Sequence, residues 1–221
     1  MIKEFLLNLI FPPKCILCET ILEKDETDLC RCCRVESPWC AKNNLKLTFL
    51  DSWTAVWYYK GNIRKSLHRY KFRRARHYAP AYGRLLAMKL LTEYPDGFDL
   101  LTWVPVSRFR RFVRGYDQVE LLAEAVGAEL NLEPLRLLEK IRHNRPQSRI
   151  SGSAKRRANV LGVYRMKKDA VVDGKRVLLL DDIITTGATA GEAARVLLTA
   201  GAKEVHLGCV AAALHHKQDK R

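Results

Sequence analysis

An apolar run that leads into two acids and a threonine-glycine turn constrains the fold of this chain more than any other feature. Residues 177–180 follow the turn-forming pair Asp173-Gly174 and contain no polar side chain, which is typical of a central parallel strand buried on both faces. Residues 190–200 have helical apolar spacing and end at Gly201, and residues 205–210 return as a strand. This strand–helix–strand order predicts a parallel sheet flanked by helices on both faces.

The earlier part of the chain predicts the same alternation. Strands are expected at residues 53–59 and 100–106, and helices at residues 62–72, 82–94 and 117–130, with Asn62 as a helix cap. A length of 221 residues allows one ordinary domain with a small attachment. We expect an N-terminal module over residues 1–45, formed by an apolar helix and a cysteine-rich segment, and an α/β domain over residues 46–221.

The acids and the turn after the apolar run predict a ribose-5-phosphate site. Ligands of open parallel sheets bind beyond the carboxyl ends of the strands. Asp181 and Asp182 are placed there to accept hydrogen bonds from two ribose hydroxyls. The following turn opens a helix, so its free backbone N–H groups and the helix dipole favour a phosphate. The expected 5-phosphate residues are Thr185, Thr186, Gly187, Ala188 and Thr189.

Two other interpretations of this segment are weaker. An apolar strand that ends in two acids also occurs in the magnesium-binding strand of P-loop ATPases. That class requires a G-x-x-x-x-G-K-[ST] loop, and the sequence contains none. A purely structural turn would not need paired acids together with three threonines.

Six of the seven cysteines lie between Cys15 and Cys40, which predicts a metal site. Two Cys-x2-Cys pairs are separated by eleven residues, and such pairs can present four thiolates tetrahedrally to zinc. The expected ligands are Cys15, Cys18, Cys30 and Cys33, in a structural site with no position left for water. Cys32 and Cys40 stay open, because either could replace Cys33 or be a bystander thiol.

The charge predicts a partner that carries phosphate. Lysine and arginine number 39 against 24 acids, a net charge of +15. Residues 69–76 and 108–116 interleave aromatic and basic side chains, as proteins that hold single-stranded nucleic acid do. The alternative is that Tyr70, Phe72 and Phe112 are core residues of amphipathic helices.

No apolar run approaches the roughly 18–20 residues that a membrane-spanning helix needs. Residues 1–11 are apolar but short and are interrupted by Asn8, so we expect an amphipathic helix docked on the body. We expect no stable membrane insertion and a cytoplasmic location.

Residues 177–189 resemble the PRPP signature of type I phosphoribosyltransferases. With the cysteine pairs and the arginine segments, the whole chain resembles the competence protein F (ComF) family. The resemblance implies that magnesium and PRPP bind at the acids and the threonine turn. It also implies that residues 104–118 form a pyrophosphate loop and that residues 142–148 and 156–160 belong to a flexible loop over the substrate. The candidates there are Arg108, Arg111, Arg114, Arg142 and Arg157.

The chain departs from the family pattern at three places. Ser107 replaces a usual proline, and Asp117 replaces a usual asparagine, where it would also serve as a helix N-cap. A threonine usual before Gln147 is absent.

The family is associated with natural transformation, beside a helicase-like partner and recombination proteins. One hypothesis is therefore a magnesium- and PRPP-dependent phosphoribosyltransferase, whose acceptor and catalytic residue the sequence does not name. The alternative is a non-catalytic protein that handles single-stranded DNA on a phosphoribosyltransferase scaffold. A third is an orphan metabolic protein that keeps only the sugar-phosphate site.

Overall fold

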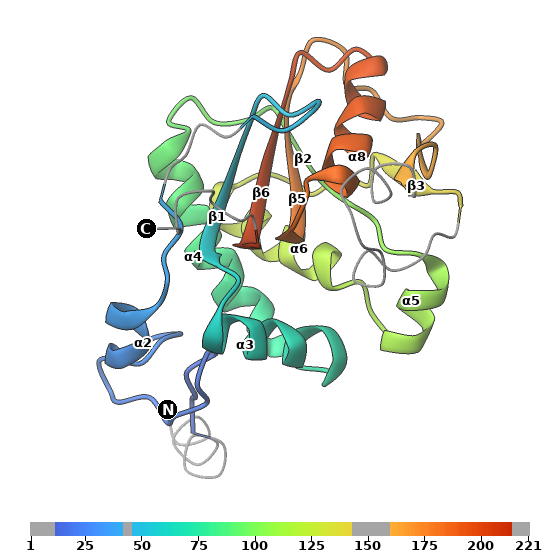
Figure 1. The fold of residues 1–221 in the computed structure, drawn as a ribbon. Helices are drawn as coiled ribbons and strands as arrows, with labels where there is room; N and C mark the ends of the chain where they lie inside the picture. The colour runs from blue at the N-terminus through green and yellow to red at the C-terminus, as the bar shows by residue number, and fades with distance from the viewer. Residues whose placement is uncertain (1–11, 42–45, 143–159, 214–221) are drawn as a thin grey trace, which may run out of the picture.

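Four parallel strands form the central sheet. The structure is a computed structural model that describes residues 12–41, 46–142 and 160–213. The strands are β1 (Ser52–Tyr58), β6 (Glu204–Ala212), β5 (Arg176–Ile184) and β2 (Leu100–Trp103), in that spatial order. All three strand pairs are parallel, which confirms the predicted sheet (Figure 1).

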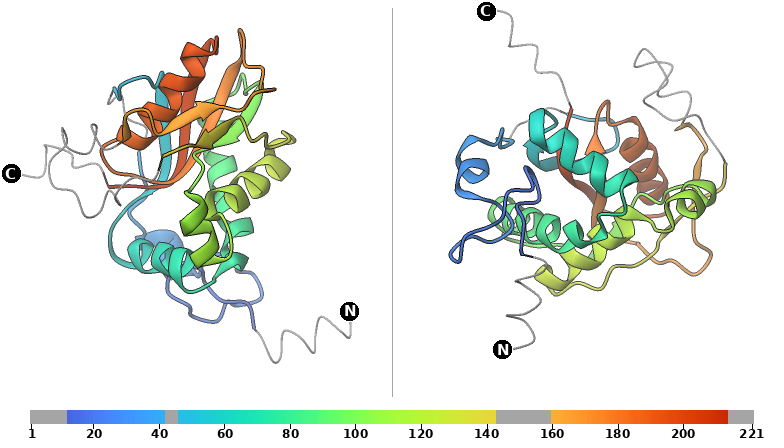
Figure 2. Two further views of the ribbon diagram at one scale, coloured as in Figure 1. Left: turned by 90° about the vertical axis from the view of Figure 1, so that its right-hand side faces the viewer. Right: turned by 90° about the horizontal axis from the view of Figure 1, so that it is seen from below.

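Helices cover both faces of this sheet. One face packs against α3 (Gly61–Phe72), α4 (Ala79–Glu93) and α6 (Gln118–Leu130), and Leu178 and Leu180 of β5 point into that layer. Val177 and Leu179 point to the opposite face, which is covered by α8 (Ala188–Thr199). Figure 2 shows α8 on the opposite side of the strands from α4 and α6. Two covered faces explain why β5 is apolar at successive positions.

The remaining elements surround this layered core. The short strands β3 (Leu138–Lys140) and β4 (Tyr164–Met166) pair antiparallel beside α8. The other short elements are α2 (Arg31–Glu36), the 3-10 turn η1 (Arg76–Tyr78) and α5 (Arg108–Arg114). Cys15, Leu17 and Leu29 belong to the same buried cluster as Tyr70 and Tyr82, so the cysteine-rich segment packs directly on the α3–α4 layer.

Several expected boundaries were wrong, and three of them concern residues that the sequence analysis had singled out. β5 continues to Ile184, so both acids lie inside the strand and not after it. The second expected strand ends at Trp103, before the proline at 105. Asn62 is not a cap, because helix α3 begins at Gly61 and its N-cap position is Lys60, which makes no side-chain cap hydrogen bond.

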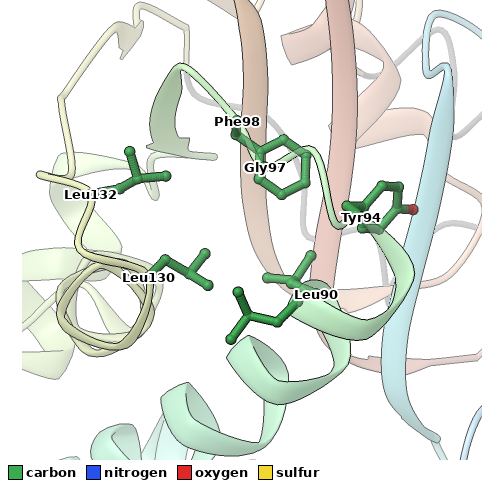
Figure 3. Close-up of a pocket in the computed structure, with 7 residues that line it drawn as sticks. Leu90, Tyr94, Gly97, Phe98, Leu130 and Leu132 are labelled. Carbon is green, nitrogen blue, oxygen red and sulfur yellow. The ribbon is translucent and has the colours of Figure 1, made fainter.

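A small apolar pocket of about 120 Å³ lies at the amino end of the strands (Figure 3). Leucines of α4 and α6 line it together with Tyr94, Gly97 and Phe98, just before β2. Its lining contains no charged side chain, and it lies at the opposite edge of the sheet from Asp181 and Asp182.

None of the helices in the described ranges is long and apolar enough to cross a membrane. The amphipathic helix expected over residues 1–11 lies outside these ranges.

Candidate functional site

The two acids of β5 point to opposite faces of the sheet, because successive side chains alternate along a strand. Asp182 is buried on the α3–α6 face, where its Oδ1 lies 2.8 Å from Lys71 Nζ and its Oδ2 accepts from Gln118 Nε2 at 2.9 Å. Burial by itself would raise the pKa of Asp182, but Lys71 and Gln118 outweigh burial and hold the pKa below its ordinary value. Asp182 is therefore a paired carboxylate.

Asp181 has a different environment. Its side chain is partly exposed, and Oδ1 accepts from the backbone N–H of Asp182 at 2.8 Å. Among the described residues, no lysine or arginine forms an ion pair with Asp181 within 4.0 Å. Burial and the neighbouring Asp182 carboxylate raise the pKa of Asp181. This carboxylate can still accept a ligand hydroxyl or contact a cation.

The phosphate turn follows directly after β5. Gly187 is the N-cap of α8 and has a φ of +72°, in the left-handed region that favours glycine. A Cβ at this position would also meet Leu47 Cδ2 at 3.1 Å. The N–H of Ala188 donates to Thr186 Oγ1 at 3.4 Å, and Thr185 is exposed. The turn therefore places the amino end of a twelve-residue helix next to the acids.

Lys140 is a cation near Asp181 that the sequence analysis missed. Its Nζ lies 5.5 Å from the centroid of the Tyr164 ring, its partner across the β3–β4 pair. Burial lowers the pKa of Lys140 to about 8, Arg110 adds to that effect, and Asp181 opposes it. The only feature of the sequence that could have indicated Lys140 is its position just before residues 142–148, which resemble the flexible loop of phosphoribosyltransferases.

Lys71 and Gln118 are the other residues that sequence reasoning did not place at the site. Lys71 lies in the segment 69–76, which we had considered for nucleic acid. Gln118 was noted only as the end of the pyrophosphate-loop segment. Its Oε1 is buried and has no hydrogen-bond partner in the described part of the chain.

The predicted arginines whose side chains the structure describes have separate contacts. Arg114 lies near Asp182 and places its guanidinium 4.9 Å from the centroid of the Phe72 ring. Arg111 pairs with Glu120 at 3.3 Å, and Arg142 donates to the carbonyl of Leu161 at 2.6 Å. The side chain of Arg108 and the whole of Arg157 lie outside the described residues.

Two of the three departures from the family pattern cap helices. Ser107 Oγ accepts from the N–H of Arg110 at the start of α5. Asp117 accepts from Val119 N–H at 2.9 Å as the N-cap of α6, which confirms that expectation, and its other oxygen accepts from Val106 N–H. Asp117 thus joins the loop after β2 to α6, and both of its carboxylate oxygens accept backbone N–H groups.

The four expected metal ligands come together in space. The sulfur atoms of Cys15, Cys18, Cys30 and Cys33 all lie within 4.8 Å of one another. Tetrahedral zinc, with Zn–S bonds of about 2.3 Å, places its sulfurs about 3.8 Å apart, and Cys18 Sγ lies 3.6 Å from Cys30 Sγ. The group includes neither Cys32, which is exposed beside Glu36, nor the buried Cys40. This cluster could hold a metal ion, and its donor set fits structural zinc.

An exposed aromatic and basic surface lies on α5 and the end of α3. Phe112 is 87% exposed and Phe72 is 60% exposed, so the interpretation of these two rings as core residues was wrong. Tyr70 is fully buried, as that interpretation proposed. We call Phe72, Phe112 and Arg114 the aromatic-basic surface.

Comparison with known proteins shows to which family this chain belongs. The phosphoribosyl transferase domain family matches residues 121–221. Competence protein ComFC of Streptococcus pneumoniae strain R6 is 30% identical over 225 aligned residues, which cover 87% of this chain and 96% of that protein. The chain belongs to the ComFC family. The resemblance to competence protein F is thereby confirmed, and so is a phosphoribosyltransferase-like parallel sheet with an N-terminal cysteine cluster.

Other relatives of this ComFC-family chain match over a shorter region. DNA utilization protein YhgH of Escherichia coli O157:H7 is 30% identical over 149 residues, 65% of this chain and 64% of that protein. The chain thus spans less than two thirds of the length of that relative. A purine phosphoribosyltransferase structure from Pyrococcus horikoshii Ot3 aligns with 61% of this chain and 73% of its own, at 21% identity and a TM-score of 0.39, which is too low a likeness to transfer a ligand.

Proposed function

We propose that this ComFC-family protein binds PRPP, or a related ribose-5-phosphate ligand, with magnesium at the carboxyl edge of its sheet. Asp181 accepts the ribose hydroxyls, Asp182 holds Lys71 and Gln118 on the other face of the strand, and the turn 185–189 holds the 5-phosphate. The observation that carries the proposal is the contrast between the acids. Asp182 forms an ion pair with Lys71 at 2.8 Å, whereas Asp181 is partly exposed on the strand that leads into a helix start that favours phosphate.

The charges around Asp181 suit a diphosphate and its magnesium ion. Arg110 and Lys140 lie on one side, and Lys71 and Arg114 lie beside Asp182 on the other. Magnesium prefers carboxylate and phosphate oxygens, and it keeps several waters when bound. Asp181 fits that donor set. Bound magnesium would reduce the repulsion between the phosphate groups, while the cationic side chains orient the diphosphate.

Transfer of the ribose to an acceptor is a further step that the site chemistry permits. Departure of pyrophosphate leaves positive charge on the anomeric carbon and negative charge on the leaving group. Cationic side chains near the diphosphate stabilise the second of these. Pyrophosphate release that depends on an added acceptor would identify such an activity.

Lys140→Met tests where the diphosphate lies. A hydrogen bond to a charged group contributes about 1.5–3 kcal/mol, so we expect Kd for magnesium-PRPP to rise about ten- to 150-fold. Ribose 5-phosphate lacks the diphosphate, so its affinity should stay within about twofold. Isothermal calorimetry measures both ligands. An equal loss of affinity for both ligands would show that Lys140 does not contact the diphosphate.

The same titrations should show a bell-shaped dependence on pH in the wild type. As pH rises above about 8, Lys140 loses its charge in the free protein and the affinity falls. As pH falls through the raised pKa of Asp181, the carboxylate is protonated and the affinity falls again. In Lys140→Met the alkaline fall should be absent while the acid fall stays.

A second candidate function is binding of single-stranded DNA at the aromatic-basic surface. Phe112 is almost fully exposed, and the Arg114 guanidinium stacks on the exposed Phe72 ring. Rings and cations exposed together provide stacking for bases and charge for phosphates. This binding is compatible with a phosphoribosyl ligand at the acids.

Phe112→Ala is expected to weaken binding of a labelled oligothymidylate. Loss of one base stack costs about 1–3 kcal/mol, which is about five- to 150-fold in Kd. Leu91 is an exposed apolar residue on α4, so Leu91→Ala is the matched control and should leave the Kd for the oligothymidylate unchanged. Fluorescence anisotropy over a salt series measures both variants, and affinity should fall steeply as salt rises. Equal Kd values for the two variants would count against this surface.

A further inference from the structure

The first Cys-x2-Cys pair, residues 15–18, is called the first cysteine knuckle. Side chains of helix α3 donate hydrogen bonds to the backbone carbonyls of this knuckle. Ile16 and Leu17 are the residues between Cys15 and Cys18. Arg69 Nη2 donates to Ile16 O at 3.1 Å and to Leu17 O at 2.8 Å, and Ser66 Oγ donates to Ile16 O. In Figure 1, α3 lies beside the dark-blue N-terminal segment.

Tyr70 and Lys71, the next two residues of the same helix, contact the site formed by Asp181 and Asp182, which we call the acidic site. Tyr70 OH donates to the carbonyl of Gln118 at 2.6 Å, and Lys71 Nζ binds Asp182 Oδ1 at 2.8 Å. Gln118 in turn donates to the other oxygen of Asp182. Arg69 and Lys71 are separated by about 3 Å along the helix axis, at a rise of about 1.5 Å per residue.

The connection between the two sites is buried and tightly packed. Ser66 and Tyr70 are fully buried, and the side chains of Arg69 and Lys71 are 14% and 18% exposed. The Tyr82 hydroxyl lies 2.6 Å from Ser66 Oγ, and Arg69 Nε donates to Tyr78 OH at 3.1 Å. A close-packed interior of this kind transmits a displacement instead of absorbing it.

We propose that Arg69 is a positioning residue that couples the cysteine cluster to the acidic site through α3. This proposal rests on the proposed function, because it concerns the affinity of the same phosphoribosyl site. Four bound thiolates fix the Cys15–Cys18 knuckle, and the fixed carbonyls of Ile16 and Leu17 hold Arg69. With Arg69 held, Lys71 keeps Asp182 in one place beside Asp181. A free knuckle leaves Nη2 of Arg69 without its two fixed carbonyl acceptors, so the protein with a metal-bound cluster binds the phosphoribosyl ligand more tightly.

The test compares Arg69→Met with Arg64→Met. Arg64 lies exposed on the same helix, so its substitution makes the same chemical change without touching the knuckle. We expect metal-loaded Arg69→Met to keep its metal and to bind magnesium-PRPP about five- to 150-fold more weakly, the usual range of coupling between sites. Chelation of the wild type should produce a loss of similar size, and chelation of Arg69→Met should add little. Arg64→Met should match the wild type. Ser66→Ala should weaken binding in the same direction as Arg69→Met.

Two readouts separate this proposal from the proposed function. If the metal-loaded wild type binds no magnesium-PRPP, the proposed function fails. The coupling is then judged by amide hydrogen exchange alone. Exchange in α3 and in the last residues of β5 should be faster in Arg69→Met than in Arg64→Met. Unchanged ligand affinity in Arg69→Met with its metal retained would overturn the coupling. So would equal exchange in the two variants.

Discussion

Asp181→Asn combined with Asp182→Asn is expected to remove measurable magnesium-PRPP binding while the fold and the metal content stay intact. The amide has the same shape as the carboxylate but carries no charge, so Asp181 loses its attraction for magnesium and accepts hydroxyl hydrogens less strongly. At position 182 the change frees Lys71, whose side chain is 18% exposed and can reach water. Calorimetric titration measures ligand binding, and circular dichroism and metal analysis verify the protein.

Single substitutions and a control sharpen this result. Asp169→Asn, an exposed acid before β5, should bind like the wild type. Asp181→Asn should account for most of the loss of affinity. Of the two acids, Asp182 pairs with Lys71, whereas Asp181 has no ion pair among the described residues. Wild-type affinity in the double variant would reject the site. Loss of metal or of folded structure in that variant would show that the acids serve the fold.

Cys15→Ser is expected to abolish metal binding and to lower the stability of the whole protein. Structural zinc contributes about 10–16 kcal/mol of apparent binding free energy in zinc-finger peptides at neutral pH. Cys15 is fully buried in the cluster that also contains Tyr70 and Tyr82, so loosening this knuckle exposes the α3–α4 layer. Metal analysis should show the loss of one bound ion per chain. Thermal melting should show a lower midpoint.

Cys32→Ser is the matched control for this prediction. Cys32 lies next to Cys33 in sequence but is exposed and outside the group of four sulfur atoms. It should keep both the metal and the melting midpoint of the wild type. Equal metal contents in Cys15→Ser and the wild type would show that Cys15 is not needed to hold the metal, against this prediction.

Local patterns alone predicted most of the secondary structure and much of the candidate site. The apolar run 177–180 predicted a strand buried on both faces, as β5 is, and Gly187 can adopt the left-handed conformation that the turn requires. The cysteine spacing likewise predicted which four sulfur atoms meet. Each of these features depends on residues close together in the chain, so their chemistry can be recognised without the fold.

The length of β5 depends on a strand that lies farther along the chain. Asp181 and Ile183 pair with Cys209 and Ala211 of β6, and this pairing extends the strand past its apolar run. The polar character of the two acids had suggested an earlier end. Hydrogen bonding to a neighbouring strand overrode that local preference.

The sequence by itself determined the order of the four central strands and of helices α3, α4, α6 and α8, the acid–turn–helix segment and the four cysteines. Only the tertiary structure decided that Lys71 pairs with Asp182, 111 residues away, and that Lys140 lies near Asp181. It also decided that Phe72 and Phe112 are exposed while Tyr70 is buried. Charge pairing and burial depend on which distant segments meet when the sheet and its helices pack, and a local pattern of residue types does not contain that information.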